Sequence, residues 1–234
     1  MICKDELKKI TIAIDGPAAS GKSTTAKLVA HKLGYFHIYT GAMYRAITLK
    51  ALDEKIDLND KKEIVRLAQT STIRLEVENC TTKVFLEGIE VTKRIRTQLV
   101  SRSVSTVSSY EGVREVMVQE QQKMAASGGV VLEGRDIGTV VLPKAELKIF
   151  MVASVEERAR RRKGELTLVG IEANQDDLIK EIEMRDQKDS TRAVSPLRKA
   201  PDAIELDTSH LTIEEQVDFI LERAKEIIRE KGKS

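Results

Sequence analysis

The stretch that decides the fold is Lys9-Ile10-Thr11-Ile12-Ala13-Ile14-Asp15-Gly16-Pro17-Ala18-Ala19-Ser20-Gly21-Lys22-Ser23. Residues 16–23 match the phosphate-loop pattern G-x-x-x-x-G-K-[ST]. Residues 9–15 are mostly apolar and rich in β-branched side chains, which is typical of a buried parallel strand. Residues 24–33 have helical spacing and end at Gly34. Strand, glycine-rich turn and helix together predict a loop that binds the phosphates of a nucleotide.

Each residue type in this loop has a chemical role. Gly16 and Gly21 allow the backbone to curl so that its N–H groups point at phosphate oxygens. We expect Lys22 to bridge the outer phosphates and the Ser23 hydroxyl to ligate Mg²⁺. The predicted nucleotide contacts are Gly16, Pro17, Ala18, Ala19, Ser20, Gly21, Lys22, Ser23 and Thr24.

Composition excludes several classes of protein. The 39 Lys and Arg residues nearly balance the 37 Asp and Glu residues, which leaves a net charge of +2 and no bulk attraction for nucleic acid. Aromatic residues make up 3% of the chain and Trp is absent, so there is little to stack on unpaired bases. We therefore expect small-molecule partners and no nucleic acid.

The cysteines and the apolar runs bear on location. Cys3 and Cys80 are isolated, so they form no metal-ligand pair and no disulfide framework, which fits a reducing cytosol. Residues 1–9 carry charges of both signs, unlike a signal peptide. No run reaches the roughly 18 apolar residues of a membrane span. We expect a cytoplasmic protein with no membrane contact.

Strands and helices alternate along most of the chain. Strands are expected at 9–15, 35–39, 129–133, 146–152 and 203–206, and helices at 24–33, 42–52, 154–163, 176–188 and 212–230. This alternation predicts a single α/β domain over residues 1–234, with a five-stranded parallel sheet and helices on both faces.

One segment departs from that alternation. Residues 72–78 alternate with period two, a turn follows at 79–82, and a second strand covers 83–87 and ends at Gly88. A helix from Asn59 or Asp60 precedes this hairpin, and helical stretches at 95–110 and 112–127 follow it. We interpret residues 59–110 as a small accessory insertion.

Ligands of open parallel sheets bind beyond the carboxyl ends of the strands. We therefore expect segments 16–23, 39–45, 133–139 and 158–162 to converge there. Arg45 could bind a second phosphate, or it could be a solvated helix residue.

Three other charged segments have similarly open interpretations. Arg135 could serve the site or merely bridge neighbouring acids. Arg158 shares a helix face with Arg161 or with Arg162, which could also be a solvated basic face. Residues 185–192 could be functional or only a charged helix end. The three histidines, His31, His37 and His210, lack ligand partners at useful spacing and are interpreted as structural or surface residues.

Three motifs together resemble bacterial cytidylate kinases. They are Thr40-Gly41-Ala42-Met43-Tyr44-Arg45, residues 133–141 (EGRDIGTVV) and residues 185–197 (RDQKDSTRAVSPL). The resemblance covers nearly the whole chain in order. It implies a P-loop kinase core, a nucleoside monophosphate-binding insertion at 59–110, a basic lid at 158–174, and transfer of the γ-phosphoryl group of ATP to CMP or dCMP with Mg²⁺. It also suggests a monomer.

The resemblance assigns residues to each substrate. Lys22 and Ser23 would hold the ATP phosphates and Mg²⁺, and Arg158 and Arg162 would be lid arginines that close on the transferred group, with Lys22 and Arg135 also catalytic. The positions expected to bind CMP are Thr40, Tyr44, Arg45 and Arg135 at the phosphate, Ser105, Arg114 and Asp136 at cytosine with Arg192 nearby, and Arg185 and Asp189 near the sugar.

This chain departs from many relatives at two positions. Tyr39 stands where many carry an acidic residue, and Lys188 stands where some have Arg. The first departure puts a phosphate-adjacent or Mg²⁺-water role of that position in doubt.

Two alternatives to a cytidylate kinase remain open at this point. Another small-metabolite kinase would share the phosphate loop and differ in segment 40–45 and residues 135–136. A nucleotide-dependent switch protein of the GTPase type would need an N-K-x-D guanine-reading element, which the sequence lacks. An acceptor profile separates these alternatives.

Overall fold

The computed structural model describes residues 9–78, 81–168 and 170–233. Its centre is a five-stranded parallel sheet in the order β2-β6-β1-β7-β8. The strands are β1 (Thr11–Asp15), β2 (Phe36–Tyr39), β6 (Val130–Gly134), β7 (Leu147–Val152) and β8 (Ile204–Asp207). The predicted sheet is confirmed, and each strand lies within two residues of its expected bounds.

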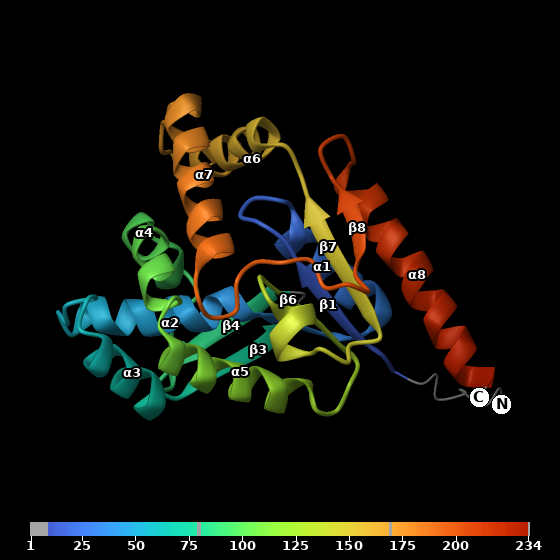
Figure 1. Ribbon diagram of the computed structural model, residues 1–234, viewed down its shortest axis with the longest axis horizontal. Helices are drawn as coiled ribbons and strands as arrows, with labels where there is room; N and C mark the ends of the chain where they lie inside the picture. Colours follow the sequence, from blue (N-terminus) through green and yellow to red (C-terminus); the bar gives the residue numbers. More distant parts are fainter. Residues whose placement is uncertain (1–8, 79–80, 169, 234) are drawn as a thin grey trace.

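Helices cover both faces of this sheet (Figure 1). Ile12 and Ile14 of β1 pack with α1 (Lys22–Leu33) and α8 (Ile213–Lys233) in one apolar cluster. Ala13, between them, belongs to a second cluster with α2 (Thr40–Asp53) and α5 (Glu111–Ala125). Because successive strand residues point to opposite faces, one short strand serves both cores.

The insertion extends the second cluster. It comprises α3 (Lys61–Thr70), a three-stranded antiparallel sheet of β3 (Ile73–Glu78), β4 (Thr81–Leu86) and β5 (Ile89–Glu90), the short helix η1 (Arg94–Arg96) and α4 (Gln98–Val107). The hairpin was predicted, but β5 was not: Gly88, with φ of 80°, turns the chain back for only two exposed residues. Part of the expected turn at 79–82, with Cys80 and also Cys3, lies outside the described residues.

Two helices beyond the sheet overlap or adjoin the segment predicted as a lid, residues 158–174. They are α6 (Val155–Thr167) and α7 (Gln175–Thr191), which share a small apolar cluster of their own. The helix expected at 154–163 is therefore wrong at its end. Leu166 is buried in the lid cluster, and this tertiary contact continues the helix past Gly164 to Thr167.

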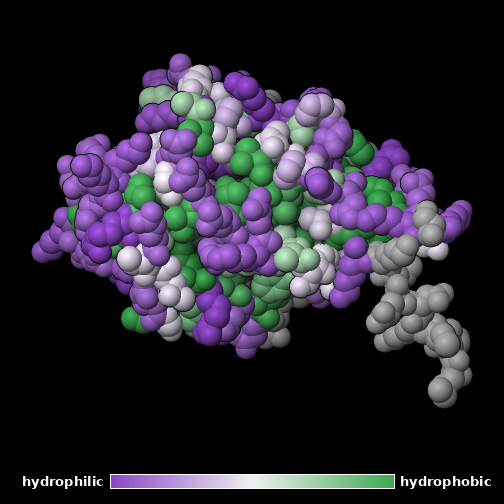
Figure 2. Space-filling model, turned by 60° about the horizontal axis from the view of Figure 1, so that its bottom comes forward, coloured by the Kyte–Doolittle hydropathy of each residue, from purple (hydrophilic) through white to green (hydrophobic). Residues whose placement is uncertain are grey.

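Helix starts follow the sequence signals. Asp60 accepts a hydrogen bond from the Glu63 N–H, and Ser154 accepts one from the Glu157 N–H. Among the described helices, none is both long and apolar enough to cross a membrane. Hydrophilic residues predominate on the surface in Figure 2, with hydrophobic residues showing between them.

Candidate active site

The phosphate loop connects β1 to α1 in a conformation that its glycines permit. A Cβ on Gly16 would overlap the carbonyl oxygen of Met151 on β7, so no larger residue fits. Gly21 has φ of 92° immediately before α1, a left-handed conformation in which L side chains are strained. The N-terminus of α1 thus faces the loop, as an anion site requires.

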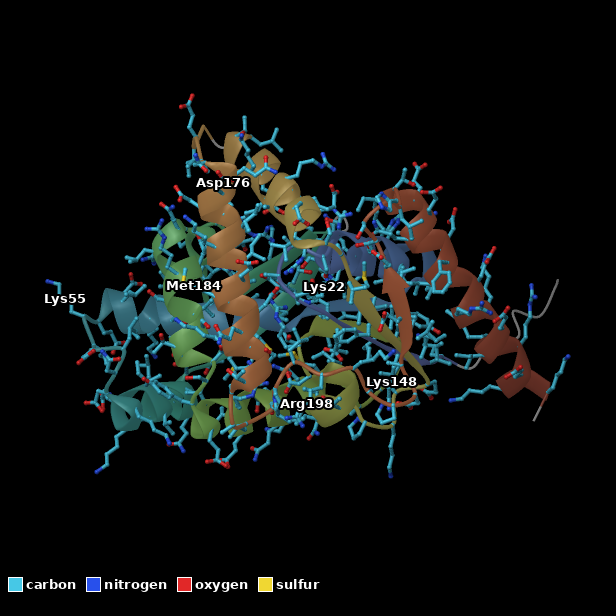
Figure 3. The ribbon with its side chains drawn as sticks, turned by 45° about the horizontal axis from the view of Figure 1, so that its top comes forward. Lys22, Lys55, Lys148, Asp176, Met184 and Arg198 are labelled. Atoms are coloured by element: carbon cyan, nitrogen blue, oxygen red, sulfur yellow. The ribbon has the colours of Figure 1, made fainter. Side chains whose placement is uncertain are left out.

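Lys22 is buried near the middle of the molecule (Figure 3). Its Nζ donates a 2.6 Å hydrogen bond to the Pro17 carbonyl and so reaches back across the loop. Burial lowers the pKa of Lys22 well below its usual range, and the positive charge of Arg135 lowers it further. An anion placed here would relieve both effects.

Ser23 faces a buried carboxylate at the end of β6. Its Oγ donates a 2.5 Å hydrogen bond to Oε2 of Glu133, whose residue is 1% exposed. Burial raises the pKa of Glu133, but contacts with His37, Lys22 and Ser23 outweigh burial and lower it overall, so the carboxylate is ionised. A hydroxyl and a carboxylate are the hard oxygen ligands that Mg²⁺ prefers.

These two groups would need further ligands from the substrate. In the described part of the chain, no cluster of three or more His, Cys, Asp or Glu side chains is arranged to hold a metal. Mg²⁺ in phosphoryl-transfer sites commonly takes one or two carboxylates together with substrate phosphates. The donor set therefore fits a metal that arrives with a nucleotide.

A second cationic group lies beside Lys22. Arg135, just after β6, donates from Nε to Oδ2 of Asp189 on α7 at 2.8 Å. Arg185 lies one turn earlier on α7, and its buried Nε has no hydrogen-bond partner. Burial lowers the pKa of Arg185 to about 10, and the charges of Arg135 and Arg45 act in the same direction. Arg135 is thus paired with an acid, whereas Arg185 is held close to other cations with no hydrogen-bond partner at its Nε.

The predicted base-binding residues meet around another buried pair. Arg114 of α5 donates from Nη2 to Oδ2 of Asp136 at 2.5 Å, and the Arg114 guanidinium lies over the Tyr44 ring at 5.2 Å. Nη2 of Arg192 is 3.8 Å from Oδ1 of Asp136, too far for a hydrogen bond. Ser105 is half-buried on α4. Buried hydrogen-bonding atoms of this kind suit recognition of a polar base edge.

Arg45 and Thr40, both on α2, differ in what they touch. Arg45 donates from Nη1 to the Ile95 carbonyl at 3.0 Å and to Ser101 Oγ at 2.8 Å, which connects α2 to the insertion. The Thr40 hydroxyl donates to the Glu133 carbonyl at 2.7 Å. Its hydroxyl therefore supports the strand end, and a phosphate contact from Thr40 stays a prediction.

Of three arginines on α6, Arg158 and Arg161 lie beside the phosphate loop, whereas Arg162 pairs within its own helix. Arg158 donates from Nη1 to Asp186 of α7 at 2.5 Å and to the Ala18 carbonyl of the loop at 3.4 Å. Arg161 donates to the Thr208 carbonyl at 2.5 Å, and the Thr208 hydroxyl donates to the Ser20 carbonyl at 3.0 Å. Arg162 instead pairs with Glu165 at 2.9 Å.

Sequence reasoning did not select three of these residues. Glu133 ends an otherwise apolar strand, and a buried charge at that position was an available signal. Sequence spacing indicates a structural or surface role for His37, yet its Nε2 lies 3.2 Å from Glu133 Oε1. Arg161 was weighed equally with Arg162 by helical spacing, and the structure places Arg161 beside the loop.

The two departures also have definite places. Tyr39 is opposite Glu133 in the register of β2 with β6. An acidic residue is therefore present at the carboxyl end of the sheet, but on the neighbouring strand β6. Lys188 is exposed on α7.

The chain matches one family of known proteins over most of its length. The family model for cytidylate kinase matches residues 12–226. The cytidylate kinase of Bacillus subtilis (strain 168) is 53% identical over 219 residues, which cover 94% of this chain and 98% of that protein. The cytidylate kinase of Bacillus licheniformis is 54% identical over 216 residues, which cover 92% and 96%. That of Pediococcus pentosaceus is 53% identical over 213 residues, which cover 91% and 94%.

Likeness to solved structures is weaker. A shikimate kinase from Bacteroides thetaiotaomicron is 13% identical with a TM-score of 0.49, over 93% of this chain and 99% of that one. A likeness of this size identifies no function.

Proposed function

Because the chain belongs to the cytidylate kinase family, it is an ATP-dependent kinase of CMP or dCMP, and we propose how its residues divide the two substrates between them. The phosphate loop, residues 16–24, takes the ATP phosphates on its N–H groups, with Lys22 on the outer phosphates. Ser23 and Glu133 would hold Mg²⁺ together with those phosphates. When bound, the metal offsets the negative charge that develops on the transferred group.

The acceptor nucleotide and the ATP phosphates lie on opposite sides of the cluster formed by Arg135, Arg185 and Asp189. Arg45 and Arg135 bind the phosphate of the acceptor, with Thr40 and Tyr44 alongside. We add Arg185, which the family resemblance places near the sugar, because the charges of Arg135 and Arg45 both act on it. Asp189 orients Arg135 through their hydrogen bond and lies near the sugar. Ser105, Arg114, Asp136 and Arg192 bind the cytosine.

This arrangement performs phosphoryl transfer by holding two polyanions in line. Repulsion between the ATP and CMP phosphates is offset by the guanidinium and ammonium groups, and alignment alone can supply about 7–11 kcal/mol of the barrier. Arg158 and Arg162 complete the site when the lid, residues 158–174, closes over the phosphates and excludes water. The insertion, residues 59–110, would move with the CMP.

The observation that carries this proposal is the charge of the shared cluster. Burial and the nearby charge of Arg135 hold the pKa of both Lys22 and Arg185 below their usual ranges. Such a group of cations is stabilised by anions that bind between them. We further propose that all partners are small molecules and that the enzyme is a monomer in the cytoplasm.

An acceptor profile tests the proposal. ADP release is measured in a coupled assay with CMP, dCMP, UMP, AMP and shikimate, in wild type and in Arg45→Met. We expect CMP and dCMP to be preferred, and Arg45→Met to raise the KM for CMP about tenfold or more with little change for ATP, since one charged phosphate contact is lost. Activity confined to a non-pyrimidine acceptor would overturn the proposal.

A further inference from the structure

His37 lies buried between the insertion and the carboxylate that we assign to Mg²⁺. It is 7% exposed on β2, beside β6. Its Nε2 lies 3.2 Å from Glu133 Oε1, and its Nδ1 lies 3.4 Å from Thr82 Oγ1 on β4. The imidazole therefore has a polar partner on each ring nitrogen.

Glu133 is consequently held from two sides. Oε1 faces His37 of β2, and Oε2 accepts the hydrogen bond from Ser23 at the start of α1. With both oxygens engaged, the carboxylate has one favoured rotamer. That rotamer directs Oε2 toward Ser23, the residue that the phosphate-loop chemistry assigns to the metal.

We propose that His37 is a positioning residue for phosphoryl transfer: it fixes Glu133 in the orientation that receives Mg²⁺ with the nucleotide. The Nε2–H donates to Oε1 of Glu133, and Nδ1 accepts from the hydroxyl of Thr82. The link from Thr82 through His37 and Glu133 to Ser23 joins the insertion to the phosphate loop. This inference rests on the proposed function, because it requires nucleotide and Mg²⁺ to bind at Ser23.

A purely structural histidine would have a different signature. A side chain that only fills space contributes to the stability of the fold, and its loss lowers the affinity for all ligands alike. A residue that orients a metal-binding carboxylate affects specifically the part of nucleotide affinity that depends on the metal. Removing such an outer partner typically lowers metal affinity by 10–100-fold.

The experiment measures ADP binding by titration calorimetry, once with excess Mg²⁺ and once with EDTA, and measures CMP binding separately. The variants are His37→Leu, which removes both hydrogen bonds, and His37→Gln, whose amide N–H can still donate to Glu133. His31→Leu is the matched control, since His31 is exposed on α1. Thermal unfolding is recorded for every variant.

We expect His37→Leu to reduce the Mg²⁺-dependent gain in ADP affinity about tenfold, with ADP affinity in EDTA and CMP affinity within twofold of wild type. His37→Gln should recover most of the gain, and His31→Leu should match wild type. Equal weakening of all three binding equilibria, or a His37→Leu protein with the full Mg²⁺-dependent gain, would overturn the role of His37. Absence of that gain in wild type would instead overturn the proposed function itself.

Discussion

At the scale of single residues, Asp136 and Arg114 form a buried ion pair to which we assign recognition of the base. Both side chains are almost inaccessible, and Arg114 also donates to the Ser108 carbonyl at 3.1 Å. The pair is therefore fixed before a ligand arrives. In this assignment, its remaining hydrogen-bonding capacity, with Nη2 of Arg192 nearby, would define the polar pattern presented to the base.

Asp136→Asn changes that pattern with little change in size. We expect kcat/KM for CMP to fall about 100-fold and the preference for CMP over UMP to narrow, because a site built on buried hydrogen bonds discriminates by the partners it leaves unpaired. Steady-state kinetics with both nucleotides measure this, with thermal unfolding as the control for folding. An equal loss for both nucleotides would mean that Asp136 serves only the fold.

Asp15 makes stability depend on pH. It ends β1 and accepts hydrogen bonds from the Ile137 and Gly138 N–H groups at 2.8 and 2.7 Å. Burial nevertheless raises the pKa of Asp15 to about 6. Between about pH 4 and pH 6 the native state thus retains a proton that the unfolded chain releases, so the contribution of Asp15 to the free energy of unfolding falls as pH rises, by up to about 3 kcal/mol.

The measurement is urea unfolding of wild type and Asp15→Asn at pH 4.5, 5.5 and 7. The stability of wild type relative to the variant should decrease steadily along this series, since the asparagine does not titrate. Parallel pH profiles for the two proteins would contradict the assignment.

At the scale of the element, a substitution at Gly164 tests how helix propensity contributes to the stability of α6. Gly164 is exposed inside α6, and a Cβ added there meets no atom within 4 Å. Gly164→Ala should therefore raise the free energy of unfolding by about 0.5–1 kcal/mol, because alanine loses less backbone entropy in a helix.

The matched control for Gly164→Ala is Gly112→Ala in α5. There the added Cβ would lie 2.8 Å from Cγ1 of Val65, a stiff β-branched neighbour, so we expect destabilisation. Chemical denaturation of both variants gives the comparison. The same sign of change in both would show that helix propensity alone, and not the local packing, sets the outcome.

Elements with a strong local signal were predictable, and those set by distant contacts were not. The strands of the sheet and the helix start at Asp60 follow from local periodicity and side-chain capping. The end of α6 depends on Leu166 finding the lid cluster, and the helical turn at Ile137–Val141 is held by Asp15 from another strand. Periodicity within one segment contains neither contact.

The same distinction applies to the site. The motif around Lys22 identifies itself, because its residue types are adjacent in sequence. The contact of His37 with Glu133 joins residues 96 positions apart, and a lone histidine in an apolar strand carries no mark of its partner. The preference for Arg161 over Arg162 beside the loop depends on where Thr208 lies.

At the scale of the whole molecule, the site takes its side chains from helices that are anchored in three apolar clusters. One cluster anchors α1 and α8, a second anchors α2, α5 and the insertion, and a third holds α6 and α7 together. In Figure 1 the strands β7 and β8 point toward α6 and α7, so the carboxyl ends of the sheet face the lid. The separate cluster of α6 and α7 would allow these two helices to move relative to the sheet without exposing either main core, whereas the insertion shares its cluster with the sheet.

The most direct test is a crystal structure of the full chain with CMP, Mg²⁺ and a non-hydrolysable ATP analogue. We expect the CMP phosphate within hydrogen-bond distance of the guanidinium groups of Arg45, Arg135 and Arg185, on the opposite side of the transferred group from the loop. The γ-phosphate of the analogue should lie on Lys22, and Mg²⁺ should lie between Ser23 and the analogue. A CMP phosphate bound away from these arginines, with their guanidinium groups turned from Lys22, would contradict this arrangement.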